Sequence, residues 1–160
     1  MICQWPVQRD VKLFACGRCL PCRINKQREW VGRLEMELKA HLFTSFVTLT
    51  YADEALPTDL CVKKREVQLF LKRLRMLIPK RRIRYFACGE YGSDKARPHY
   101  HLILYGIHHS EGYLIKEAWT ENGLLKGRIQ IGPVQRGGLA YCLSYVTKGQ
   151  IGRASCRERV

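Results

Sequence analysis

The sequence predicts an α+β fold in which helices flank an antiparallel sheet, with a cysteine-rich segment at the N-terminus. Three observations predict this class. Runs of β-branched and aromatic residues alternate with amphipathic, basic segments of helical periodicity. Two of these runs, 83–90 and 99–105, are joined by a short turn-like connector, which is typical of a hairpin. Four of the eight cysteines lie within the first 22 residues, around Gly17 and Pro21.

The first half of the chain contains two predicted helices and one predicted strand. Residues 1–22 form a loop or knuckle, and a helix follows over 23–42, where apolar residues recur at helical spacing among charged ones. The β-branched and aromatic run 43–51 predicts a strand, and 52–61 an acidic loop. A second helix over 62–78 has one apolar and one basic face and ends at a proline.

The second half contains three predicted strands and two predicted helices. The hairpin strands 83–90 and 99–105 are followed by a short helix over 113–121, a strand over 128–134 and a last helix over 139–148. The order β-α-β-β-α-β is that of a ferredoxin-like, split βαβ antiparallel sheet with flanking helices.

The expected organisation has three parts: a cysteine-rich knuckle over 1–22, the main domain over 23–150, and a foreign tail over 151–160. The last ten residues have almost no periodic apolar face. They match, residue for residue, the translation of a common sequencing-adapter oligonucleotide in one reading frame. We therefore expect a non-native tail, which is excluded from fold reasoning, and a natural chain that continues past Gln150.

The charge balance indicates a polyanionic partner. Lys and Arg number 28 against 14 Asp and Glu, which gives a net charge of +14 and a pI near 9.7. A domain this basic most often faces phosphate backbones. No apolar run approaches the roughly 20 residues that a membrane span needs, and the N-terminus lacks the pattern of a signal peptide. We expect nucleic acid as the partner and no membrane.

The pair His99 and His101 is the most informative feature of the chain. Side chains at i and i+2 on a strand point to the same face, so the two imidazoles project side by side and make half of a divalent-metal site. The alternative is two half-buried histidines that are hydrogen-bonded to neighbours. A hard third ligand is expected from Glu90 on the paired strand, with Asp94 in the connecting turn as the competitor. This ligand set suits Mg²⁺ or Mn²⁺.

The last predicted helix carries Tyr141, Tyr145 and Lys148 on one face, because residues three or four apart are neighbours on a helix. One interpretation is core packing of two amphipathic tyrosines. Beside a metal site in a basic protein, a tyrosine is instead a candidate nucleophile on phosphorus. Tyrosine is normally protonated at neutral pH, so it needs a nearby cation, which Lys148 supplies in this interpretation.

The N-terminal cysteines form a separate candidate site. Their number is the number of ligands that structural zinc takes, and a Cys-x2-Cys-x2-Cys run in a cytosolic protein more often indicates metal than disulfides. Simple reduced thiols are the alternative, and the spacing is also similar to that of iron–sulfur ligands. The candidate Zn²⁺ ligands are Cys3, Cys16, Cys19 and Cys22.

Three motifs stand in order along the chain: Phe46-Val47-Thr48-Leu49-Thr50-Tyr51, Gly89-Glu90-Tyr91-Gly92 with Arg97-Pro98-His99-Tyr100-His101, and Tyr141 with Tyr145-Val146-Thr147-Lys148. In this order they resemble the motifs of rolling-circle replication initiators of the HUH endonuclease superfamily. With Trp30 and the segment Cys-Gly-Arg-Cys-Leu-Pro-Cys-Arg at 16–23, they resemble more narrowly the initiators of gokushovirus-type microviruses, which are small single-stranded DNA phages. The resemblance covers essentially 1–150.

The resemblance implies a metal-dependent tyrosine DNA endonuclease and strand transferase built on an HUH-type ferredoxin-like domain. Such an enzyme nicks and rejoins single-stranded DNA at a phage origin through a 5′-phosphotyrosine, in the cytoplasm of a bacterial host. The 160 residues contain no Walker-type loop, so we expect a host helicase to unwind the origin. The matching positions are His99, His101 and Glu90 for the metal, Tyr145 for the nucleophile, Tyr141 for a second tyrosine and Lys148 for the motif lysine.

One alternative function remains open. A non-catalytic basic module, with or without zinc in its cysteine knuckle, would bind single-stranded nucleic acid through basic and aromatic side chains.

Overall fold

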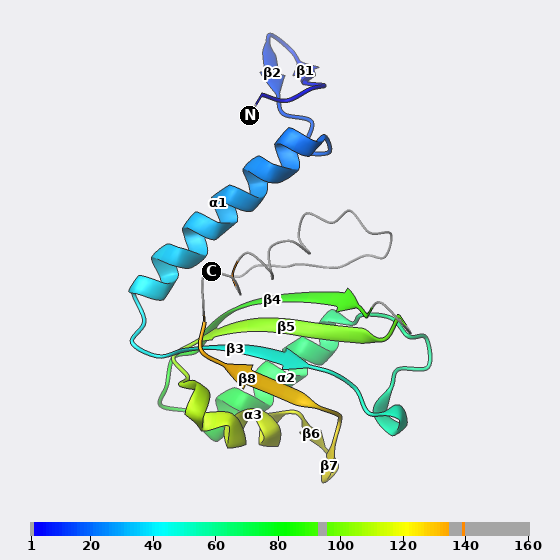
Figure 1. The fold of residues 1–160 in the computed structure, drawn as a ribbon, viewed down its shortest axis with the longest axis vertical. Helices are drawn as coiled ribbons and strands as arrows, with labels where there is room; N and C mark the ends of the chain where they lie inside the picture. The colour runs from blue at the N-terminus through cyan, green and yellow to red at the C-terminus, as the bar shows by residue number, and fades with distance from the viewer. Residues whose placement is uncertain (1, 93–95, 135–138, 140–160) are drawn as a thin grey trace.

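The structure is a computed structural model that describes residues 2–92, 96–134 and 139 of the chain (Figure 1). Its centre is a four-stranded antiparallel sheet with the strand order β4-β5-β3-β8. The four strands are β3 (Thr44–Leu49), β4 (Arg84–Tyr91), β5 (Pro98–Tyr105) and β8 (Ile129–Gly132). Helix α2 (Lys64–Leu77) connects β3 to β4, and α3 (Gly112–Ala118) connects β5 to β8. This is the predicted ferredoxin-like arrangement, so the α+β class is confirmed.

The two faces of the sheet are covered by different helices. Helices α2 and α3 cover one face, where Phe70, Leu102 and Trp119 are fully buried in the larger hydrophobic cluster. Helix α1 (Leu20–Lys39) covers part of the other face, where Leu34 packs in a cluster with Ile103. Figure 1 shows α1 extending away from the sheet towards the N-terminus.

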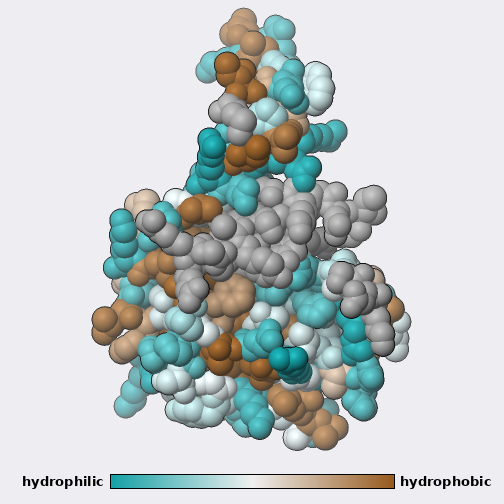
Figure 2. All heavy atoms as spheres, viewed as in Figure 1, coloured by the Kyte–Doolittle hydropathy of each residue, from teal (hydrophilic) through white to brown (hydrophobic). Residues whose placement is uncertain are grey.

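The cysteine-rich segment contains structure that the sequence analysis did not predict. Residues expected to form a loop or knuckle include a hairpin of β1 (Val7–Arg9) and β2 (Lys12–Phe14). Each strand has three residues, all of them exposed, so no burial periodicity marks them. Helix α1 also begins before the predicted residue 23, because Pro21 occupies its first turn, where proline is favoured. Figure 2 shows hydrophobic and hydrophilic residues mixed over this projecting part.

The region after α3 also differs from the prediction. The helix expected over 113–121 ends at Ala118, and β6 (Thr120–Glu121) pairs with β7 (Leu124–Leu125). Asn122 and Gly123 between them have φ values of 53° and 78°, as a two-residue Asn-Gly hairpin turn requires. Two single-turn 3₁₀ helices complete the described elements, η1 (Asp53–Ala55) and η2 (His109–Glu111).

The predicted last helix over 139–148 lies outside the described residues except for Leu139, which is 1% exposed and packs with Leu34. The expected foreign tail over 151–160 lies outside them as well. In the part of the chain that the structure describes, no helix has the length and apolarity that crossing a membrane requires.

Candidate functional site

Glu90, His99 and His101 lie on one face of the sheet, where the end of β4 pairs with the start of β5. The register sets Glu90 opposite His99 and Cys88 opposite His101. Because side chains alternate along a strand, all four share one face. Nε2 of His101 lies 2.6 Å from Oε1 of Glu90, so the structure brings these two predicted ligands into direct contact.

Strand β3 fixes the other side of the His101 ring. Thr48 is the register partner of His101, and its Oγ1 lies 3.0 Å from Nδ1 of the ring. The Phe46 ring stacks on the same imidazole, with 5.9 Å between centroids and an interplanar angle of 27°. His101 is only 4% exposed, so contacts from two neighbouring strands determine its orientation.

His99 is held in one tautomer. Its Nδ1 lies 2.7 Å from the carbonyl oxygen of Arg97. A carbonyl oxygen only accepts, so Nδ1 donates and the lone pair of the neutral ring lies on Nε2. Metal-binding histidines are commonly oriented by such a bond from the nitrogen that faces away from the metal. Nε2 of His99 therefore has the properties of a ligand atom.

The turn before β5 is built around the His99 ring. The Gly92 amide donates to the Arg97 carbonyl at 2.9 Å, and a Cβ at position 92 would lie 2.8 Å from Cε1 of His99. The Arg97 guanidinium donates to the Tyr51 carbonyl at 2.8 Å and pairs with Asp53. These bonds tie the start of the histidine strand to the residues that follow β3.

The donor set of this face fits a divalent ion. Two imidazole nitrogens and a carboxylate suit Mn²⁺ and related ions, with positions left open for phosphate oxygens. The donors do not enclose a point, however. Among the described residues, the one group of three or more His, Cys, Asp or Glu side chains whose ligand atoms all lie within 4.8 Å of one another is the cysteine cluster. The ligand roles of Glu90, His99 and His101 stay predictions.

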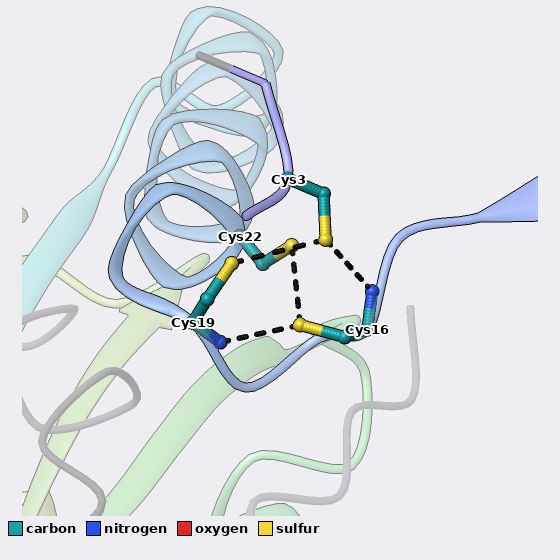
Figure 3. Close-up of side chains that lie close together, drawn as sticks. All are labelled: Cys3, Cys16, Cys19 and Cys22. Atoms are coloured by element: carbon teal, nitrogen blue, oxygen red, sulfur yellow. Dashed lines mark hydrogen bonds between the residues drawn. The ribbon is translucent and has the colours of Figure 1, made fainter. Parts of the chain in front are cut away.

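The cysteine cluster lies where α1 begins (Figure 3). Its members are Cys3, Cys16, Cys19 and Cys22. Burial raises the pKa of the Cys19 thiol, but the backbone amides of Gln4 and Cys22 and the thiols of Cys22 and Cys16 outweigh burial and lower this pKa to about 6. The Cys19 thiol in turn raises the pKa of Cys22 to about 12. The cluster therefore carries its first negative charge at Cys19.

A family model that describes replication-associated proteins of the ORF2 type matches residues 44–150. The chain belongs to this family. The match runs from β3 through β8, so it includes the face that carries Glu90, His99 and His101.

Curated relatives of this replication-associated protein come from bacterial viruses. Replication-associated protein ORF2 of Spiroplasma virus 4 is 32% identical over 155 residues, which cover 83% of this chain and 47% of the relative. Replication-associated protein VP4 of Bdellovibrio phage phiMH2K is 29% identical over 157 residues, which cover 84% and 48%. Replication-associated protein ORF4 of Chlamydia phage 1 is 29% identical over 104 residues, which cover 61% and 26%. The chain thus spans about half the length of the first two relatives. No solved structure matches it.

Some candidate residues lie outside the described part of the replication-associated protein. These are Tyr141, Tyr145 and Lys148, together with Asp94, the competitor of Glu90. Conversely, the structure assigns Thr48 a contact that the sequence analysis did not identify. Thr48 stood within the first motif, but its contact with His101 follows from the β3–β5 register, which the sequence does not specify.

Proposed function

We propose that this replication-associated protein nicks and rejoins single-stranded DNA at a phage origin through a 5′-phosphotyrosine intermediate. The observation that carries the proposal is the direct contact between Glu90 and His101, with His99 on the same sheet face, in a chain of the replication-associated family. In this proposal the protein is a metal-dependent tyrosine endonuclease and strand transferase of the HUH type, and the chain is a piece of a microvirus initiator.

The sheet face supplies the binding site for the ion. Mg²⁺ or Mn²⁺ bound there supplies Lewis-acid polarisation of the scissile phosphate. Glu90 offers a hard oxygen donor, and His99 and His101 each offer an imidazole nitrogen. Thr48 and the Arg97 carbonyl hold the two rings, so both donors stay on the face where the phosphate binds.

Tyr145 is the proposed nucleophile. Its phenol oxygen attacks phosphorus, the bond from phosphorus to the 3′ oxygen breaks, the phenol loses its proton, and the departing 3′ oxygen gains one. The products are a 5′-phosphotyrosine and a free 3′-OH, and rejoining reverses these steps. Lys148 favours the phenolate of Tyr145, and Tyr141, one turn earlier in the predicted helix, accepts a second strand transfer.

The partners in this proposal follow from the charge. The net charge of +14 favours contacts with the phosphates of single-stranded and origin DNA. Binding takes place in the cytoplasm of the bacterial host, where a host helicase unwinds the origin.

A second candidate function, binding of single strands without cleavage, is favoured by the N-terminal hairpin. Trp5 is 69% and Phe14 49% exposed, and Arg9 and Lys12 face each other in the hairpin register. Exposed aromatic rings beside basic side chains are typical of surfaces that stack unpaired bases.

An adduct assay separates the two functions. The protein is incubated with Mn²⁺ and oligonucleotides that tile the single-stranded genome of a related microvirus, each labelled at the 5′ or the 3′ end. Cleavage predicts a denaturation-resistant protein adduct that carries the 3′ label, and a shortened 5′-labelled strand free of protein. Chelation should abolish both. Binding of the same oligonucleotides with neither product would overturn the nicking proposal and support the binding module.

A further inference from the structure

We propose that Cys3, Cys16, Cys19 and Cys22 bind one Zn²⁺ ion, which holds the N-terminal segment together at the start of α1. The cluster precedes residue 44, where the family match begins, so it is separate from the proposed nicking site. Figure 3 shows the four side chains converging on one point from two segments, with Cys3 on the N-terminal strand of chain and the others on the loop and first turn of the helix.

The distances between the sulfurs match one tetrahedral ion. Four thiolates at about 2.3 Å from zinc lie about 3.8 Å apart along the edges of the tetrahedron. The Sγ atoms of Cys16 and Cys22 are 4.0 Å apart, those of Cys19 and Cys3 are 3.9 Å apart, and all four lie within 4.8 Å of one another. Disulfides would bring the sulfurs together in pairs at about 2.05 Å. An iron–sulfur cluster distributes its thiolates over several irons and spreads them farther apart than a single ion does.

Backbone amides are directed at the sulfurs. The Cys16 amide donates to Sγ of Cys3 at 3.2 Å, and the amides of Arg18 and Cys19 each donate to Sγ of Cys16 at 3.4 Å. Hydrogen bonds to a thiolate favour its charged form, which is the form that binds metal. Gly17 permits this loop, because its φ of +73° lies in the left-handed region that favours glycine.

The N-terminal segment has no apolar core that would fold it otherwise. From residue 2 to residue 18 no side chain is buried, and both strands of the hairpin are exposed along their whole length. The buried residues of the segment are Cys19 and Cys22, which are 4% and 8% exposed. An isolated two-stranded hairpin is marginal in water, and small modules of this kind depend on a metal or disulfides for stability. Zinc is the ion that four clustered thiolates favour.

Metal analysis of the whole chain, purified without chelator, tests the proposal. We expect about one zinc per chain, lost in Cys19→Ser and in Cys3→Ser. Cys61→Ser is the matched control, because Cys61 is an exposed thiol outside the cluster, and it should keep the zinc. Protein without zinc, iron in its place, or the same zinc content in Cys19→Ser as in Cys61→Ser would overturn the assignment.

A second measurement needs no variant and therefore does not depend on whether a variant folds. The unmodified protein is alkylated before and after chelation, and each modified cysteine is identified by peptide mass. The four cluster thiols should react at least about tenfold more slowly before chelation, because metal-bound thiolates are shielded, while Cys61 reacts equally fast in both states. Equal reactivity of the cluster thiols in both states would refute zinc ligation, whatever the outcome of the DNA adduct assay.

Discussion

Oε1 of Glu90 lies 2.6 Å from Nε2 of His101, although the strand register sets Glu90 opposite His99. The contact therefore runs diagonally across β4 and β5. Thr48 on β3 reaches the other nitrogen of the same ring at 3.0 Å. Three adjacent strands thus converge on one imidazole, and strand pairing, rather than the conformation of a loop, positions the centre of the candidate site.

The first prediction concerns His99. His99→Ala removes one proposed donor, so DNA cleavage should fall by about 100-fold or more, since even the groups that support metal ligands typically contribute roughly 10–100-fold. Binding of single-stranded DNA should change little, because it depends on Lys and Arg contacts with phosphates. Adduct formation and a binding titration measure the two effects, with His109→Ala as a control outside the site. Full cleavage by the His99→Ala/His101→Ala double variant would exclude the proposed metal site.

The second prediction concerns Thr48 as a positioning residue. Thr48→Val keeps the shape of the side chain but removes the oxygen beside Nδ1 of His101, which frees the ring to turn. The Mn²⁺ concentration for half-maximal cleavage should rise by about 10–100-fold. Thr44→Val, on the same strand, is the matched control and should leave this concentration unchanged. A lower maximal rate with an unchanged Mn²⁺ requirement would show that Thr48 does not act through the ion.

The third prediction compares two glycines. In Gly92→Ala the new Cβ would lie 2.8 Å from Cε1 of His99, so the ring must move and its bond to the Arg97 carbonyl must weaken. Cleavage should fall as it does in His99→Ala. In Gly32→Ala nothing lies within 4 Å of the new Cβ, and alanine in the interior of α1 should raise the free energy of unfolding by about 1 kcal/mol without affecting cleavage. Thermal unfolding and the adduct assay test both variants, and equal cleavage by the two would remove the role assigned to Gly92.

The long elements of the sheet domain could be predicted from the sequence because their periodicity is extended. Helix α2 has apolar and basic faces over 14 residues, and β5 is an eight-residue run buried along most of its length. The three-residue strands β1 and β2 carry no such signal, because all of their residues are exposed and no buried face imposes an alternation. The Asn122-Gly123 turn did carry a signal, but the helical pattern before it was extended too far.

The site was predictable only within one strand or one hairpin. His99 and His101 share a face because of strand geometry, and Glu90 lies on the adjacent strand of the same hairpin. Thr48 contacts His101 across 53 positions of sequence, and that contact depends on how β3 pairs with β5. No local pattern encodes a pairing between strands that are separated by a helix and another strand.

The last prediction assigns the covalent link to Tyr145. Lys148 lies three positions after Tyr145 in the predicted helix, so it favours the Tyr145 phenolate and makes this residue the first nucleophile. Peptide mapping of the DNA adduct should find Tyr145, and in Tyr145→Phe the link should move to Tyr141, which the same helix face presents one turn earlier. Tyr113→Phe, at an exposed tyrosine of α3, is the control and should leave the adduct on Tyr145. Two tyrosines in one site would let the second accept the strand that the first releases, as continuous rolling-circle replication requires. An adduct on neither residue would mean that this segment is structural and that the nucleophile lies elsewhere in the chain.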